Sequence, residues 1–131
     1  VAACTFEANG FALARTFWDA ALRLDPGAPD DARLPMRRRG ELDALFGAAP
    51  LLDVTVEDIV IEARYADFED FWAPLSSGVG PAASYLVAQD EARRGAIRDL
   101  CFEILGRPSG AFELPALTGR GPTSSSPAAT C

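Results

Sequence analysis

Three carboxylates at positions 67, 69 and 70 stand close enough in the chain to act as metal ligands or as an acid–base pair. They lie where a short aromatic segment with Phe68 and Phe71 predicts the start of a helix. A carboxylate in that place accepts hydrogen bonds from free backbone N–H groups and opposes the helix dipole. We therefore favour helix capping by Asp67 over catalysis, and we predict no metal site.

Two other motifs have the residue types that bind phosphate: the arginine run at 37–39 and the Gly-Val-Gly stretch at 78–80. A charge run in a loop of an acidic protein is more typical of a solvated surface. Phosphate loops lie between a strand and a helix and carry further glycines or a Lys-Ser/Thr pair, whereas this stretch ends in Pro81. We expect Gly78 and Gly80 to adopt positive φ, in a loop that acts as a lid.

The composition argues against several classes of function. The net charge of −7 argues against a nucleic-acid partner. The chain has no histidine, which removes the commonest general base and metal ligand. Its three cysteines, Cys4, Cys101 and Cys131, fit neither a disulfide framework nor a zinc site, and they indicate a cytoplasmic location.

The N-terminal residues and the apolar runs bear on targeting. No run approaches the roughly 20 apolar residues of a membrane span. The first residues lack a basic region, so we expect no signal peptide and no membrane partner. The chain begins with Val1, so we expect the natural start to lie upstream.

Periodicity predicts secondary structure along the first half. An apolar run at 1–6 predicts a buried strand, and Asn9 is a candidate cap for a helix at 11–22 that ends before Asp25-Pro26. A loop dense in helix breakers follows at 25–40, and then a short helix at 41–49.

The second half begins with the strongest strand signal, at 53–65. Its alternation changes phase midway, which predicts a β-bulge. After the short helix capped by Asp67 we expect a long helix at about 90–105, ended by Gly106. A last strand is predicted at 111–117.

This order indicates an α/β layer architecture with three strands. The strand at 1–6 looks central, and a sheet that begins with a central strand lacks its neighbours. We therefore predict that residues 1–117 are the C-terminal half of a larger domain. Residues 118–131, rich in Gly, Pro, Ser and Thr, are predicted to form a flexible tail.

Four segments carry a family resemblance when they are taken together in this order. They are Phe-Trp-Asp-Ala-Ala at 17–21 with Leu-Asp-Pro at 24–26, Glu-Leu-Asp-Ala-Leu-Phe at 41–46, Tyr-Ala-Asp-Phe-Glu-Asp-Phe-Trp-Ala-Pro at 65–74, and Gly-Val-Gly-Pro-Ala at 78–82 with Tyr85. They resemble class I S-adenosylmethionine-dependent methyltransferases of the type 11 or ubiquinone-biosynthesis-like group. The resemblance covers residues 1–117.

The resemblance implies a Rossmann-like sheet of seven strands in which the last strand is antiparallel. Its fifth, sixth and seventh strands would be 1–6, 53–65 and 111–117. The family binds S-adenosylmethionine on the first four strands, starting with an acidic-Gly-x-Gly-x-Gly stretch that this sequence does not contain. We therefore assign no cofactor-binding residue and expect no S-adenosylmethionine binding by this chain alone.

The resemblance also implies which side of the enzyme is present, namely the side that binds the methyl acceptor. The positions that it marks as facing the substrate are Phe6, Glu7, Phe71, Trp72, Gly78, Gly80, Pro81 and Tyr85. The aromatic residues among them are, as a type, more often part of a core. No catalytic residue is assigned. The implied reaction moves a methyl group to an O, N or C atom of a small-molecule acceptor, mainly through proximity and exclusion of water.

Two interpretations remain open. In the first, the chain is the acceptor-side part of a methyltransferase and is inactive when isolated. In the second, it is a non-enzymatic remnant or a small binding or interaction module. The sequence does not assign an acceptor or an oligomeric state.

Overall fold

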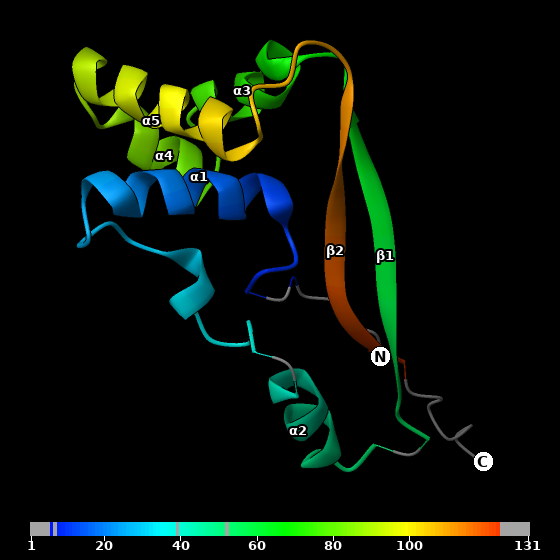
Figure 1. The fold of residues 1–131 in the computed structure, drawn as a ribbon. Coiled ribbons are helices and arrows are strands. Elements are labelled where there is room, and N and C mark those ends of the chain that lie inside the picture. The colour runs from blue at the N-terminus through cyan, green and yellow to red at the C-terminus, as the bar shows by residue number, and fades with distance from the viewer. Residues whose placement is uncertain (1–5, 7, 39, 52, 124–131) are drawn as a thin grey trace.

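The computed structural model describes residues 6, 8–38, 40–51 and 53–123. Within them the chain is mixed α/β: a layer of packed helices stands beside a long two-stranded ribbon (Figure 1). In chain order the elements are α1 (Ala12–Leu24), a 3₁₀ turn η1 (Asp31–Arg33), α2 (Glu41–Gly47), β1 (Thr55–Tyr65), α3 (Phe68–Ser76), α4 (Pro81–Val87), α5 (Glu91–Ile104) and β2 (Phe112–Thr123).

Helix α1 confirms the predicted helix at 11–22. Its apolar face is buried, with Phe17 at 0% and Trp18 at 1% exposure. It ends at Leu24, before the Asp25-Pro26 pair, because the residue before a proline is disfavoured in helical conformation. The predicted cap was wrong: the N-cap is Phe11, with extended backbone and no side-chain hydrogen bond, so the helix begins too late for Asn9 to cap it.

The core lies between α1 and α5 and is closed by α3 and α4 (Figure 1). Helix α5 contributes Ile97 and Cys101, both fully buried. Full burial of each large apolar side chain stabilises the fold by about 1.5–3 kcal/mol. The other large buried core residues are Phe17, Trp18, Phe68, Phe71, Leu75 and Leu86.

Capping residues fix the ends of α3 and α5 as the sequence predicted. The Asp67 carboxylate accepts a hydrogen bond from the Asp70 amide at 2.9 Å, and the Asp70 carboxylate accepts one from the Ala66 amide at 3.0 Å. At the far end of α5, Gly106 adopts φ +77°, the left-handed conformation that commonly ends a helix.

Helix α4 was not predicted. It follows the expected glycine loop directly, with Gly80 at its N-cap and Pro81 in its first turn. Proline suits this place because its missing N–H has no partner inside the helix anyway.

The sheet differs from the three-strand prediction. Within the described residues it has two strands, β1 and β2, which pair antiparallel from Thr55↔Thr123 to Tyr65↔Phe112. The Rossmann-like arrangement is therefore not confirmed, and the predicted strand at 1–6 lies outside the described residues except for Phe6. The antiparallel direction of the last strand is confirmed.

An irregularity is present where the phase change in β1 predicts one, but the extra residue lies in β2 rather than in β1. The register shifts between Glu57 and Ile59, where one residue of β1 stands opposite two of β2. Strand β2 continues through Thr123, past the end predicted at Leu117, because β1 is long enough to pair with it along its whole length. The rest of the predicted tail, 124–131, lies outside the described residues. No helix in the described part of the chain is long and apolar enough to cross a bilayer.

Candidate functional site

A groove of about 430 Å³ opens between the start of α1, the loop around η1, the end of β1 and the connection from α3 to α4. We call it the Phe6 groove. Its volume falls within the range of about 300–1,000 Å³ typical of small-molecule sites. The lining is mostly apolar: Phe6, Phe11, Leu13, Ala14, Tyr65, Pro74, Leu75, Val79, Gly80, Pro81, Ala82 and Ala83, with Asp31 and Arg37 as its charged members.

Aromatic rings form one side of the Phe6 groove. Phe6 and Phe11 stack with ring centroids 5.0 Å apart and an angle of 22° between the ring planes. Tyr65, the last residue of β1, is held by stacking on Phe112 at 5.3 Å and by an edge contact with Phe71 at 5.4 Å. Burial, and then the nearby Asp70 carboxylate, raise the pKa of Tyr65. Flat rings of this kind suit a planar apolar ligand.

The opposite side of the groove is the short connection between α3 and α4. Gly78 and Gly80 have φ +75° and +89°, so the predicted positive φ angles are confirmed. Side-chain hydrogen bonds hold the connection: the Ser84 hydroxyl donates to the Gly78 carbonyl at 3.1 Å, and the Ser77 hydroxyl donates to the Pro74 carbonyl at 2.6 Å. The rim is therefore fixed by its own contacts, with Val79 81% exposed upon it.

The polar edge of the groove links the N-terminal segment to the loop around η1. The Arg37 guanidinium donates to the Phe6 carbonyl at 3.3 Å, and the Ala8 amide donates to the Arg37 carbonyl at 2.8 Å. Burial raises the pKa of Asp31, against the opposing effect of Arg37. Asp31 is thus a more basic carboxylate than usual, and it can accept a hydrogen bond from a ligand hydroxyl or amine.

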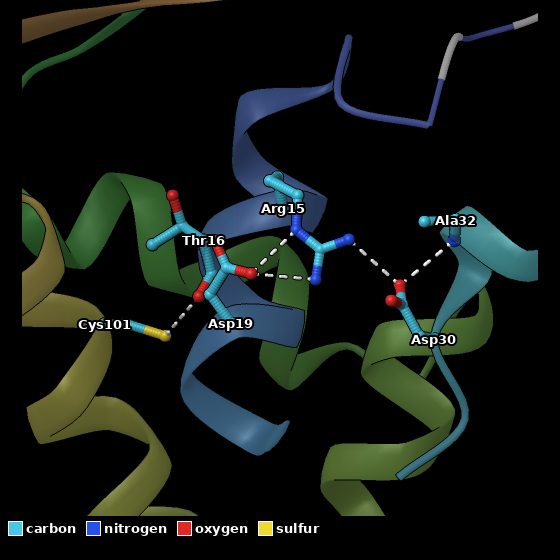
Figure 2. Close-up of polar contacts among 6 residues, drawn as sticks. All are labelled: Arg15, Thr16, Asp19, Asp30, Ala32 and Cys101. Atoms are coloured by element: carbon cyan, nitrogen blue, oxygen red, sulfur yellow. Dashed lines mark hydrogen bonds and ion pairs between the residues drawn. The ribbon is translucent and has the colours of Figure 1, made fainter. Parts of the chain in front are cut away.

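Arg15 holds the loop that carries Asp31 (Figure 2). Its guanidinium donates to Asp19 at 2.9 Å and to Asp30 at 3.0 Å, and the same Asp30 oxygen accepts from the Ala32 amide at 3.0 Å. Asp30 therefore caps η1 while it is tied to α1. The hydrogen bonds of Asp30 to Arg15 and to the Ala32 amide fix the position of Asp31, which lies between Asp30 and Ala32 in the chain.

The structure brings together three of the positions marked as facing the substrate: Phe6, Gly80 and Pro81 all line the Phe6 groove. Gly78 is next to that lining, and a Cβ atom built on it would lie 3.8 Å from the Val87 side chain. Glu7 lies outside the described residues.

The other three marked aromatic residues, besides Phe6, lie elsewhere. Phe71 is fully buried in the core, which is the usual place of such a residue. Tyr85 packs against the core residues Phe17 and Trp18, and its hydroxyl donates to Asp25 at 3.2 Å. Trp72 lines a separate groove.

Sequence reasoning missed several members of the site. Phe11 and Leu13 stand at the start of α1, and the sequence assigned them no role beyond membership of the predicted helix. Tyr65 was assigned only to its strand. Asp31 stood in a loop rich in charges, and no local signal separates it from its acidic neighbours. These residues meet only through the tertiary fold.

Among the described residues no group of three or more His, Cys, Asp or Glu side chains is placed to hold a metal ion. Comparison with known proteins finds no matching family model, no matching curated protein and no matching solved structure.

Proposed function

We propose that this chain is the acceptor-side part of an S-adenosylmethionine-dependent methyltransferase, and that the Phe6 groove holds a small planar acceptor. One observation supports the proposal. Phe6 and the consecutive residues Gly80 and Pro81, which the sequence resemblance marks as acceptor-facing, are distant in the chain and line one groove.

The chemistry of methyl transfer is compatible with this groove. The reaction needs the acceptor atom held in line with the methyl group and shielded from water, more than it needs an acid or a base. The stacked Phe6 and Phe11 rings offer a surface for a flat acceptor. Asp31 is the group suited to orient an acceptor hydroxyl or amine, because its carboxylate can accept a hydrogen bond within a lining that is mostly apolar.

Acceptor binding is tested on the chain itself, by titration with simple phenols and naphthols while backbone amide NMR signals are recorded. We expect saturable shifts at Val79, Gly80 and Ala82. Asp31→Asn should weaken a phenol but leave its methyl ether unchanged, because the ether has no proton to donate. Shifts confined to residues away from the groove would overturn this part of the proposal.

Methyl transfer is tested on the product of the gene's complete reading frame. If the proposal holds, the sequence upstream of Val1 contains a strand followed by an acidic-Gly-x-Gly-x-Gly turn. Ultraviolet cross-linking with radiolabelled S-adenosylmethionine should then label the complete product and leave the present chain unlabelled. An upstream sequence without that turn, together with no labelling, would refute the assignment.

A second candidate function is favoured by one feature of the groove, namely that described residues of this chain alone can line it. Such a groove can hold a ligand without another domain, so the chain can work as a small binding module. Phenol binding by the chain, combined with no labelling of the complete product, would support this module and exclude the methyltransferase.

A further inference from the structure

A second groove, of about 280 Å³, lies between α3, α4 and α5 and shares no residue with the Phe6 groove. We call it the Trp72 groove. Its lining includes Trp72, Val87, Glu91, Arg94, Gly95 and Arg98. We propose that it binds a small carboxylate with an apolar ring, the carboxylate on Arg94 and the ring against Trp72.

Arg94 and Arg98 stand one turn apart on α5 and differ in what they contact. The Arg98 guanidinium forms an ion pair with Glu69, and its carbon lies 5.1 Å from the centre of the Phe68 ring. The Arg94 side chain has no hydrogen bond, ion pair or ring contact among the described residues. Arg98 is thus held in place by its neighbours, while Arg94 presents a guanidinium whose fork of donors fits a carboxylate.

The apolar part of the groove fits the body of such a ligand. Trp72 is half-buried and stacks on Phe68, with ring centroids 6.2 Å apart and 18° between the planes. Val87, which also lines the groove, is 47% exposed. A ring bound between these two side chains would remove apolar surface from water on both of its faces.

Gly95 keeps part of the groove wall open. It stands inside α5, where glycine is the poorest helix former apart from proline. A Cβ atom built at Gly95 meets no atom within 4 Å, so packing within the chain does not require a glycine. What the missing side chain provides is open space on the wall of the groove.

The charge of Glu91 predicts in which direction a substitution there changes the affinity for a carboxylate. It lines the same groove on the same face of α5, one turn before Arg94 and Gly95. Its negative charge opposes a bound carboxylate, so its removal should strengthen binding while the removal of Arg94 weakens it. A pocket that attracts ligands only through apolar contact would respond to neither change.

The experiment is a titration of the full chain with phenylacetate and, separately, with its neutral analogue phenylacetamide, followed by ¹H–¹⁵N NMR. The Trp72 indole N–H and the Gly95 amide are the reporters. We expect saturable shifts with phenylacetate at roughly millimolar concentration, and binding of phenylacetamide weaker by about fivefold.

Four variants test the contributions of individual residues to binding. Arg94→Gln should weaken phenylacetate about fivefold, and Glu91→Gln should tighten it about twofold. Arg23→Gln is the matched control, because it removes an exposed arginine that does not line the groove, and it should change nothing. Gly95→Ala should lower affinity while the melting temperature holds or rises, since alanine favours the helix but fills the groove.

The proposal is overturned if phenylacetate gives no saturable shift at the two reporters. Equal affinities of the Arg94→Gln and Arg23→Gln variants would also overturn it. These outcomes are independent of the methyltransferase assignment, which depends on the Phe6 groove and on the upstream sequence.

Discussion

The Tyr85 hydroxyl donates to the Asp25 carboxylate at 3.2 Å, joining α4 to the residue that follows the last turn of α1. The ring lies against Trp18, with centroids 5.5 Å apart. Burial, and then Asp25, raise the pKa of Tyr85, because both disfavour the phenolate. This contact gives Tyr85 a structural role, at the place where α4 packs on the core.

Tyr85→Phe should therefore lower the free energy of unfolding by about 1 kcal/mol, since it removes one hydrogen bond to a charged group and keeps the ring. In a chain of this size that corresponds to a fall in Tm of roughly 4 °C. Tyr65→Phe is the matched control, because its hydroxyl has no hydrogen bond among the described contacts. Equal losses in the two variants, measured by thermal unfolding, would argue against the role of the Asp25 contact.

The buried thiol of Cys101 makes the free energy of unfolding depend on pH in the alkaline range. It is fully buried, and burial raises the pKa of its thiol to about 12 from the ordinary value of 9.0. The unfolded chain thus releases this proton at lower pH than the folded chain does. The stability that the neutral thiol contributes is complete below pH 9 and is lost as the pH rises toward 12.

The measurement is the unfolding free energy between pH 8 and about 10.5, for the native sequence and for Cys101→Ala. The variant should be less stable at pH 8, because it leaves a small void and loses the weak contact of Sγ with the Thr16 carbonyl at 3.9 Å (Figure 2). Its stability should then fall less steeply above pH 9. Identical slopes of unfolding free energy against pH for the two proteins would show that tyrosines such as Tyr85, and not the Cys101 thiol, cause the loss of stability above pH 9.

Helix capping by Asp67 is open to a direct test. Asp67→Ala removes the acceptor for the Asp70 amide and should lower the free energy of unfolding by about 1 kcal/mol. Asp99→Ala removes an exposed carboxylate from the middle of α5 and should stay within about 0.5 kcal/mol of the parent. A chemical-denaturation series measures both, and similar values for the two would show that the Asp67 cap does not stabilise the fold.

The fold shows which local signals can be read from the sequence. The end of α1 before Asp25-Pro26, the cap at Asp67 and the stop at Gly106 were all predicted, because each depends on backbone chemistry within a few residues. Helix α4 was missed, since no element was assigned between the glycine loop that ends at Pro81 and the helix predicted from about residue 90. The extent of β2 was also missed, because pairing with a distant strand overrides a composition rich in glycine and proline.

The candidate site shows what local sequence patterns do not reveal. Gly80 and Pro81 were identified from a resemblance in short segments, and the structure places both on the Phe6 groove. Leu13 and Tyr65 join them there, but the pattern of each segment accounts for these residues as ordinary members of a helix and a strand. Grooves are made by elements that are distant in sequence, so local periodicity does not reveal their lining.

Arg15 links the stability of the fold to the geometry of the Phe6 groove, and it gives the last prediction. Its two partners differ in exposure, because the Asp30 side chain is 11% exposed and the Asp19 side chain 47%. A carboxylate as buried as Asp30 loses much of its solvation by water, so it depends on the guanidinium far more than Asp19 does. Arg15→Gln should therefore lower the free energy of unfolding by about 1–2 kcal/mol, whereas Asp19→Asn should cost less than about 0.5 kcal/mol.

The same variant, Arg15→Gln, should change the pKa of Asp31, the residue that follows Asp30 and lines the Phe6 groove. Arg15 lowers the pKa of Asp31, in opposition to the burial that raises it. Arg15→Gln should therefore move that pKa further upward, which carboxyl ¹³C signals recorded across an acid titration will report. Asp19→Asn keeps the guanidinium beside Asp31 and should leave the titration nearly unchanged. An unmoved Asp31 titration in Arg15→Gln would mean that Arg15 supports the loop without contributing to the electrostatics of the groove.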